Sequence, residues 1–569
     1  MQVESPHRYE QLAEIIVGMI HTGAWLPGSR LPSVRTVSDQ HQTSISTARQ
    51  AYQLLKDRGV VVARPQAGFY LADGSIGRRP ASSTSSSPVP AGDEHPAYRY
   101  EQLVDLIAAM IEKGTLTPGM RLPSVREISD QHHVSVSTVL QAYRQLESIG
   151  SIVARPKSGF YVSASAGATL ELPTTSRPRA KASSVSIGGA VAALLQHASN
   201  STLVPLGCAV PEATSLQSKR LDLALARAAR RHGAHHNVYG SVNGDERLRR
   251  EIAKRAIRVG HAMSADDVIV TAGCTEAMTL ALTSVAKRGD TIAVESPTYF
   301  GLLHALEVLG MKALELPTDP TRGINVDALA RVLETETVAA CMVSSSFNNP
   351  MGSSMSDGDK LALLEVLARH RVPLIEDDVY GDFYFGRDRP TPFSALDNGK
   401  NTIYCSSFSK TLAPGYRIGW IAPGAYAQQV VERKLAFSLC SAVLPQVALA
   451  DYLTTGDYDA HLRRMRRTLE ENVVRMTRLI EAHFPSETRV SRPTGGFALW
   501  LELPKRFDSR ALFDEALEHG ICFAPGDVFS AARRFRNCLR LSAGATWSDR
   551  LEDGVKRLGR LAQAQLKSG

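Results

Sequence analysis

The stretch SFSKTLAPGYR, residues 407–417, sets one lysine between a serine and an arginine. Lys410 carries an amine, which can form a Schiff base with an aldehyde. Ser407 and Arg417 are side chains that bind anions, and arginine in particular suits phosphate. The stretch therefore indicates a site for a phosphorylated carbonyl compound.

Further groups that suit such a compound occur in a fixed order along the chain. AGCTEA (272–277) joins a strand to a helix start, where free N–H groups and the helix dipole favour a phosphate. Asp377, in EDDVY, can hold a protonated pyridine nitrogen. Asn349 and Tyr380 can hydrogen-bond to a ring oxygen, and Tyr299 can stack on an aromatic ring. Taken with the lysine loop, these groups predict a pocket for pyridoxal 5′-phosphate.

Short apolar runs of strand length precede most of these groups. Amphipathic helical segments lie between the first four of the runs. This alternation indicates an α/β domain with a mostly parallel sheet. Functional groups in such a sheet gather at the carboxyl ends of the strands. The runs are DVIVTAG (267–273), TIAVES (291–296), AACMVSSS (339–346), VPLIEDD (372–378), TIYCSSFS (402–409) and RIGWIAP (417–423).

These residues, in this chain order, resemble the fold-type I aminotransferases over about 190–569, with a smaller C-terminal subdomain implied. By that resemblance Lys410 is the lysine that binds the cofactor covalently, and Asp377 keeps the ring nitrogen protonated. Tyr239, in NVYGSVNG, would reach the phosphate of a neighbouring subunit, and Arg540, in CLRLSAGA, would bind an α-carboxylate. Cys274 departs from the pattern, since relatives commonly carry a hydroxyl residue there, but its backbone N–H can still serve. The full implied set is Tyr239, Gly273, Cys274, Thr275, Tyr299, Asn349, Asp377, Tyr380, Ser407, Lys410 and Arg417 for the cofactor, and Arg540 for a substrate or effector.

The first part of the chain contains a repeat: residues 8–71 recur, without a gap, over 99–162. Each copy predicts three helices and a short β-hairpin, which together make a winged helix-turn-helix. In the second copy Ser124 and Glu127 form the pattern of a capping box at the start of the second helix. Ser44 or Ser46 is expected to cap the third helix of the first copy.

Both copies resemble the GntR-type DNA-binding module, in signatures such as PGSRLPSVRTVSDQHQTSIST and GVVVARPQAGFYL. The resemblance places the third helix in the major groove of double-stranded operator DNA. Arg35 and Arg126 suit phosphate or guanine contact, and the wing residues suit phosphate or the minor groove. A three-helix module used for protein contacts is the alternative. The predicted DNA-binding residues are Arg35, Ser46, Thr47, Arg49 and Arg64 in the first copy, and Arg126, Ser137, Thr138, Gln141, Arg155 and Lys157 in the second.

A chain that combines these two resemblances is similar to the MocR subfamily of GntR-type regulators. The usual member of that subfamily has one winged helix. The fold class expected is two winged helix-turn-helix (α+β) domains before an α/β aminotransferase-like domain. Ser-, Pro- and Ala-rich stretches separate them and are predicted to be flexible linkers. The expected boundaries are 1–75 and 98–164 for the winged helices, 76–97 and 165–189 for the linkers, and 190–569 for the large domain.

Composition is that of an ordinary globular protein, with 43% hydrophobic and 21% charged residues in 569. Seven scattered cysteines without a C-x-x-C pair argue against a disulfide frame or a metal site, and fit a cytoplasmic protein. No run is apolar enough for a membrane helix, and no signal pattern occurs. The net charge of +8 lies largely in arginine runs at 247–258 and 463–467, which we interpret as solvated helix faces.

Two classes of function fit these patterns. The first is a homodimeric transcription regulator that senses pyridoxal phosphate or an amino-acid-like effector. The second is a working aminotransferase that carries DNA-binding modules, because the implied catalytic set is intact. A structural scaffold fits poorly with a complete cofactor pocket.

Overall fold

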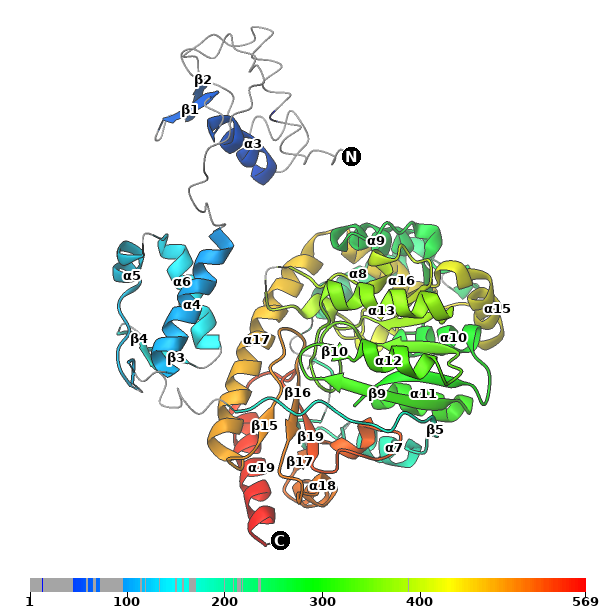
Figure 1. The fold of residues 1–569 in the computed structure, drawn as a ribbon. Coiled ribbons are helices and arrows are strands. Elements are labelled where there is room, and N and C mark those ends of the chain that lie inside the picture. Colours follow the sequence, from blue (N-terminus) through cyan, green and yellow to red (C-terminus); the bar gives the residue numbers. More distant parts are fainter. Residues whose placement is uncertain are drawn as a thin grey trace. The chain divides into compact units, whose positions relative to one another are not determined.

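The computed structural model (Figure 1) divides into two compact units, 1–93 and 94–569, which we describe separately. The described residues are 13, 45–57, 60–64, 68–71, 96–112, 115–117, 119–132, 134–148, 151–155, 158–162, 170–198, 200–207, 209–211, 216, 218–233, 237–386 and 388–568.

The first unit contains the third helix and the hairpin of the first winged helix. Helix α3 (Ile45–Asp57) precedes strands β1 (Val61–Arg64) and β2 (Gly68–Leu71), which pair antiparallel. Tyr52 is fully buried and stacks on Phe69 with ring centroids 4.6 Å apart. The hairpin thus covers the inner face of α3, as the winged-helix pattern predicts.

The second winged helix has all its predicted elements. Helices α4 (Pro96–Glu112), α5 (Val125–Gln131) and α6 (Val136–Ser148) precede the hairpin β3 (Ile152–Arg155) and β4 (Gly159–Val162). The capping box is confirmed: Glu127 N–H donates to Ser124 Oγ at 3.2 Å, and Ser124 N–H donates to the Glu127 carboxylate at 2.6 Å. Tyr143 packs edge-on against Phe160 and donates its hydroxyl to the Pro123 carbonyl, which joins the third helix to the wing and to the second helix.

The large domain is built on a mixed sheet in the order β10-β9-β8-β11-β12-β13-β14-β7. Strands β9, β8, β11, β12 and β13 are mutually parallel, whereas β14 is antiparallel to both β13 and β7. The bounds are β7 Ile269–Thr271, β8 Thr291–Ser296, β9 Lys312–Asp319, β10 Gly323–Ile324, β11 Ala340–Val343, β12 Leu374–Asp377, β13 Thr402–Ser407 and β14 Gly419–Ala422.

Helices cover both faces of this sheet because its strands are apolar on both sides. On β8, Ile292 and Val294 join a core with helices α10 and α11, whereas Ala293 joins a second core with α12 and α13. This is the α/β arrangement that the alternating pattern predicts. The helices of this part are α8 Ser218–His232, α9 Glu246–Ala256, α10 Cys274–Val285, α11 Phe300–Leu309, α12 Val326–Leu333, α13 Asp357–His370, α14 Phe393–Leu396, α15 Ala427–Phe437 and α16 Val443–Leu453.

A smaller C-terminal subdomain follows the long helix α17 (Asp457–His483). Its antiparallel sheet has the order β15-β16-β19-β18, and helices α18 (Ser509–Glu518) and α19 (Asp549–Ser568) pack with it. A separate two-strand pair, β6 and β17, connects residues near 204 with residues near 521. The bounds are β6 Val204–Pro205, β15 Arg489–Val490, β16 Ala498–Glu502, β17 Ile521–Cys522, β18 Ala524–Pro525 and β19 Cys538–Ser542.

The stretch 165–189, predicted to be a flexible linker, packs on the large domain from residue 170 onward. Strand β5 (Ser183–Ser184) pairs antiparallel with β9, and helix α7 (Gly188–Ala198) begins directly after it. Ser176 is buried, donating to the Ser296 carbonyl and accepting from Thr318 N–H. The polar composition of the stretch predicts no such packing. Hydrogen bonds of Ser176 and of strand β5 hold it, together with the buried side chains of Val185 and Ile187.

Among the helices that the structure describes, none is both long and apolar enough to cross a bilayer.

Candidate functional site

A turn between β7 and α10 forms a cradle for an anion. Gly273 caps α10 with φ +86°, a left-handed conformation that favours glycine, and the cap provides no side-chain acceptor for the first N–H groups of the helix. A Cβ added at Gly273 would lie 2.5 Å from Nη2 of Arg417. Arg417 Nη2 donates to the Ala272 carbonyl at 3.0 Å, which fixes the guanidinium beside Cys274 and Thr275 at the helix start.

A buried acid ends the central strand β12. The Asp377 Oδ1 atom accepts from Val379 N–H at 3.3 Å and lies 3.6 Å from the Cys274 thiol, which can donate to it. Burial raises the pKa of Asp377 to about 6, even though these two hydrogen bonds and the charge of Lys410 lower it. A carboxylate in this setting is stabilised by a cation placed against it.

The lysine lies on the loop after β13, at the same edge of the sheet. Its Nζ donates to the Ala209 carbonyl at 2.9 Å. Ser409 Oγ lies 3.4 Å from Arg417 Nη1, and Ser409 N–H donates to Ser407 Oγ at 3.3 Å. Ser407 and Ser409, which precede Lys410 in the chain, thus connect the lysine loop to the anion cradle through Arg417.

Three side chains from neighbouring loops close the cavity. Tyr299 caps α11 and Tyr380 follows β12; burial raises the pKa of Tyr299 to about 12 and raises that of Tyr380 further, so both remain protonated donors near neutral pH. Asn349 is 5% exposed and its amide lies near enough to the Tyr380 hydroxyl to lower the pKa of that group, but neither amide atom makes a hydrogen bond of good geometry within the described parts of the chain. A buried amide of this kind normally has a partner, so it has capacity to bind a ligand atom.

Arg540 is fully buried on β19 of the C-terminal subdomain. Its Nη2 donates to the Gly207 carbonyl at 2.6 Å, and its charge acts on the phenols of Tyr299 and Tyr380. A guanidinium fixed in this way can bind a carboxylate through two parallel hydrogen bonds.

The structure brings most of the predicted cofactor residues to one cavity. Gly273 adjoins it through the backbone, whereas Tyr239 is 82% exposed and lies apart, beside residues 440–443. Met278, Ser344, Val379 and Ser409 also line the cavity and were not singled out from the sequence, although Ser409 sits inside the quoted SFSK motif. The predicted residues that line it are Cys274, Thr275, Tyr299, Asn349, Asp377, Tyr380, Ser407, Lys410 and Arg417.

In the second winged helix, Arg126 and Gln141 are exposed, as a DNA-contacting role requires. Thr138 is half-buried, and its hydroxyl pairs with Ser135 Oγ at 2.7 Å at the start of α6, so part of its hydrogen-bonding capacity is used locally. Thr47 is half-buried on α3. Lys157 and Arg35, and the side chains of Ser46, Arg49, Arg64, Ser137 and Arg155, lie outside the described residues.

Comparison with known proteins gives the same division of the chain. The model of the gntR family of bacterial regulatory proteins matches 8–71 and 99–162, and that of class I and II aminotransferases matches 210–558. The HTH-type transcriptional regulator YjiR of Escherichia coli is 37% identical over 81% of this chain and 98% of its own length, and YdcR of the same organism is 37% identical over 82% and 100%. The chain belongs to the GntR-type regulators that carry an aminotransferase domain, the MocR-like family.

Within this family the protein is an HTH-type transcriptional regulator with two GntR-type modules and an aminotransferase-like domain. LysN, an α-aminoadipate aminotransferase of Thermus thermophilus crystallised with N-(5′-phosphopyridoxyl)-L-leucine, is 29% identical with a TM-score of 0.62, covering 67% of this chain and 95% of its own. Because YjiR is matched over nearly its whole length but this chain over only 81%, the regulator is longer than that relative.

Proposed function

We propose that this regulator binds pyridoxal 5′-phosphate in the cavity of its large domain and senses the cofactor, or an amino-acid-like effector, there. The observation that carries the proposal is the convergence of a helix-start cradle, a buried acid and a lysine amine on one cavity. Class I and II aminotransferase domains typically hold this cofactor, which agrees with the donor set. When bound, it would supply an electron-withdrawing ring for chemistry on amino compounds.

Each residue has a separate task in this proposal. Gly273, Cys274 and Thr275, through their backbone N–H groups, bind the phosphate together with Ser407 and Arg417. Asp377 holds the ring nitrogen protonated, and Asn349 and Tyr380 donate to the ring hydroxyl. Tyr299 stacks on the ring, and Lys410 supplies the amine for covalent attachment.

Arg540 suits the effector, because a buried guanidinium facing two phenols selects a carboxylate. LysN was crystallised with the leucine adduct of this cofactor, which supports an amino acid as the kind of effector. The proposed ligand is therefore an amino compound with an α-carboxylate.

The winged helices would read operator DNA through α3 and α6. Exposed Gln141 and Arg126 support base-edge and phosphate contacts respectively. Arg49 in the first copy corresponds to Leu140 in the second, which cannot donate to guanine, so the two copies would prefer different bases.

A homodimer formed by the large domains is part of the proposal. Tyr239 and Val238 are exposed by 82% and 62%, and Phe437 by 58%, so apolar groups lie open near the depression at 440–443. A partner covering them would receive Tyr239 at its own phosphate. Sedimentation analysis at micromolar concentration tests this, and a monomer with full cofactor occupancy contradicts it.

A working aminotransferase is the second candidate, because the catalytic set is complete. Purified protein is mixed with amino donors while its visible spectrum and keto-acid production are followed. A spectral change without sustained keto-acid production supports a sensor, whereas steady production supports the enzyme. A preparation that neither absorbs in the cofactor band nor takes up added cofactor overturns both.

A further inference from the structure

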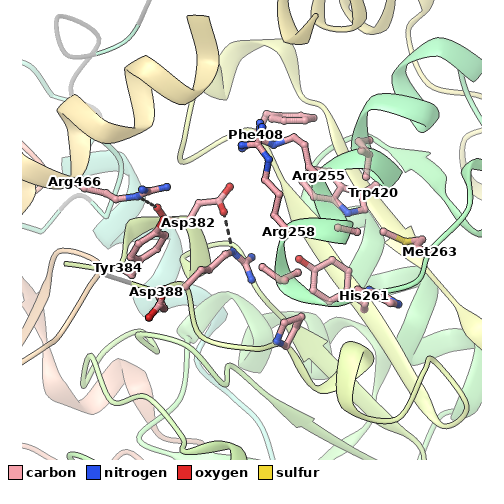
Figure 2. A pocket seen from close by; sticks show the side chains of 16 residues that line it. Arg255, Arg258, His261, Met263, Asp382, Tyr384, Asp388, Phe408, Trp420 and Arg466 are labelled. Carbon is pink, nitrogen blue, oxygen red and sulfur yellow. Dashed lines mark hydrogen bonds and ion pairs between the residues drawn. The ribbon is translucent and has the colours of Figure 1, made fainter. Parts of the chain in front are cut away.

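A second cavity lies in the large domain (Figure 2). It is on the other side of strands β13 and β14 from the cofactor cavity, as the residues of these strands that line the two cavities indicate. On β13, Ser407 lines the cofactor cavity and Tyr404 lines the second cavity. Successive residues of a strand point to opposite faces, so residues 404 and 406 share one face and 405 and 407 the other. Trp420 pairs with Ser406 across the ladder and therefore also faces the second cavity.

The second cavity has aromatic walls. Phe408 and Trp420 pack with ring centroids 4.9 Å apart, and the apolar lining also includes Tyr384, Tyr404 and Met263. Trp420 Nε1 is buried and donates to no group in the described parts of the chain. A buried N–H without an acceptor is costly, so a ligand acceptor at this point would be stabilised.

Four arginines line the same cavity, and three of them have carboxylate partners. Arg255 and Arg258 both contact Asp459, at 2.8 and 2.7 Å. Arg389 lies between Asp378, at 2.5 Å, and Asp382, at 2.8 Å.

Arg466 differs from the other three. Its Nε donates to the Asp382 carbonyl at 2.7 Å and its guanidinium lies 3.8 Å from the centre of the Tyr384 ring, but it forms no ion pair with any described carboxylate. Burial lowers the pKa of Arg466. For Arg255 the nearby Tyr458, Asp382 and Asp459 outweigh burial and raise the pKa, and for Arg389 the carboxylates of Asp378 and Asp382 do the same. The charge of Arg466 is therefore the least compensated of the four.

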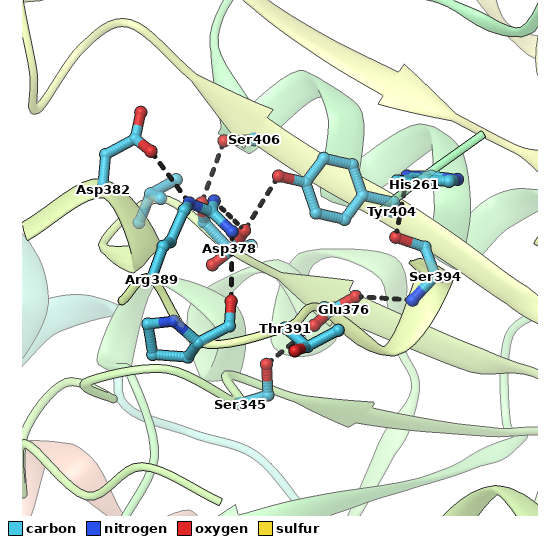
Figure 3. A network of polar contacts seen from close by, with 12 residues as sticks. His261, Ser345, Glu376, Asp378, Asp382, Arg389, Thr391, Ser394, Tyr404 and Ser406 are labelled. Atoms are coloured by element: carbon cyan, nitrogen blue, oxygen red, sulfur yellow. Dashed lines mark hydrogen bonds and ion pairs between the residues drawn. The ribbon is translucent and has the colours of Figure 1, made fainter. Parts of the chain in front are cut away.

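A polar network holds the wall of the cavity in place (Figure 3). Asp378 Oδ2 accepts from the Tyr404 hydroxyl at 2.8 Å as well as from Arg389. Ser406 Oγ donates to the Asp378 carbonyl at 2.9 Å. Since Arg389 and Tyr404 are fixed by buried partners, the cavity is preformed, and little ordering free energy opposes a ligand.

We propose that this cavity is a second ligand site, distinct from the cofactor cavity, for a small aromatic carboxylate with a hydrogen-bond acceptor opposite its carboxylate. Arg466 and Tyr384 lie toward one end and Trp420 and Met263 toward the other (Figure 2). The carboxylate would bind the terminal nitrogens of Arg466, the ring would pack between the aromatic walls, and the acceptor would receive Trp420 Nε1–H. The described residues hold no cluster suited to a metal. The lining of the cavity also includes the carboxylates of Asp382, which is paired with Arg389, and of Asp388.

The first probe is 4-hydroxybenzoate, which carries both the carboxylate and the acceptor on an aromatic ring. Benzoate lacks the acceptor, and cyclohexanecarboxylate lacks the aromatic ring. Inorganic phosphate is the fourth probe. Binding to full-length protein saturated with pyridoxal phosphate is measured by calorimetry. We expect 4-hydroxybenzoate to bind with a Kd of about 1 mM or tighter, since a ligand of this size reaches that range. Benzoate should bind more weakly, and the other two more weakly again.

Arg466→Gln should weaken the binding of 4-hydroxybenzoate about tenfold or more, because the carboxylate loses a charged hydrogen-bonding partner. Arg467→Gln, an exposed neighbour on the same helix, should leave binding unchanged. Trp420→Phe keeps an aromatic wall and should remove the preference for 4-hydroxybenzoate over benzoate, whereas Trp547→Phe, outside the cavity, should not. Melting temperature and cofactor absorbance verify that each variant folds.

Three results would overturn the proposal. The first is the absence of saturable binding of 4-hydroxybenzoate to the wild-type protein. The second is binding that Arg466→Gln and Arg467→Gln affect equally. The third is binding that Arg540→Gln abolishes and Arg466→Gln does not, which would assign the ligand to the cofactor cavity. None of these outcomes depends on whether the protein regulates transcription or transfers amino groups.

Discussion

The second winged helix and the cofactor cavity present their functional groups in opposite environments. Arg126 and Gln141 are exposed on short helices, and water solvates them when no DNA is bound. Asp377 and Arg540 are buried, and neighbouring backbone groups hold them in place. Each exposed group contributes separately to binding free energy, and salt screens its contribution. Buried groups depend on one another. Single substitutions should therefore weaken DNA binding by graded amounts, whereas in the cofactor cavity they should remove most of the function.

The largest effect is expected at Lys410. Lys410→Ala removes the only atom of this side chain that can bond covalently to an aldehyde, so the absorbance band of covalently held cofactor should disappear completely. Lys400→Ala, at an exposed position, should keep the band. Visible absorbance before and after borohydride treatment measures both, and an unchanged, reducible band in Lys410→Ala would refute the assignment.

Asp377→Asn should weaken cofactor binding by about 10- to 100-fold, because a charged hydrogen bond to the ring nitrogen is replaced by a neutral one. In the wild type, protonation of Asp377 competes with the cofactor. Its pKa of about 6 means that affinity should fall as the pH drops below about 6 and level off above it.

The variant lacks this titrating group, so its affinity should vary less with pH over the same range. Cofactor titration between pH 5 and 8, followed by fluorescence, measures both dependences. Parallel curves for the two proteins would show that another group is responsible.

Deleting residues 1–90 should weaken operator binding by well over tenfold and shorten the protected DNA. Tethered modules make the later binding events intramolecular, and avidity can gain about 10²–10⁴ from this. Footprinting and titration of the intact and shortened chains at one salt concentration test the expectation. If both chains give the same footprint and affinity, the first winged helix does not read DNA.

The smallest effect is expected at Arg126. Arg126→Ala should weaken binding to different DNA sequences by similar factors and lower the salt dependence by about one counterion, if the contact is to phosphate. Arg126→Lys keeps the charge and should keep the salt dependence. A change in base preference with an unaltered salt slope would instead indicate a guanine contact.

Much of the cofactor cavity could be predicted from the sequence because its groups follow strand ends. Strand β8 has the bounds of the run TIAVES, and Asp377 ends β12 as its position after an apolar run indicates. Residues that follow successive parallel strands therefore lie close together at one edge of the sheet. Ser344 follows a strand in the same way and was missed, since serine at a strand end carries little signal by itself.

The second cavity could not be predicted, because its residues have no common sequence pattern. The arginine runs at 247–258 and 463–467 were interpreted as solvated helix faces, which holds for Arg250 but not for Arg255 and Arg466. Both turn inward where α9, α17 and β14 meet, and only the tertiary fold brings them to Trp420. The segment 170–187 was likewise misjudged, because buried serine hydrogen bonds have no compositional signature.

The position of β14 has a consequence for how the protein matures on the ribosome. Strand β7, which leads into Gly273 and the anion cradle, is at the sheet edge, and among the strands that the structure describes it pairs only with β14, through Thr271 and Gly419. Gly419 also packs directly against the Gly273 backbone, where a side chain would collide with it. A nascent chain that has not yet emerged beyond residue 422 therefore has no partner strand for the cradle. Both winged helices can leave the ribosome and fold from local contacts long before then, so each new molecule passes through an interval in which the DNA-binding modules are formed and the phosphate site is not.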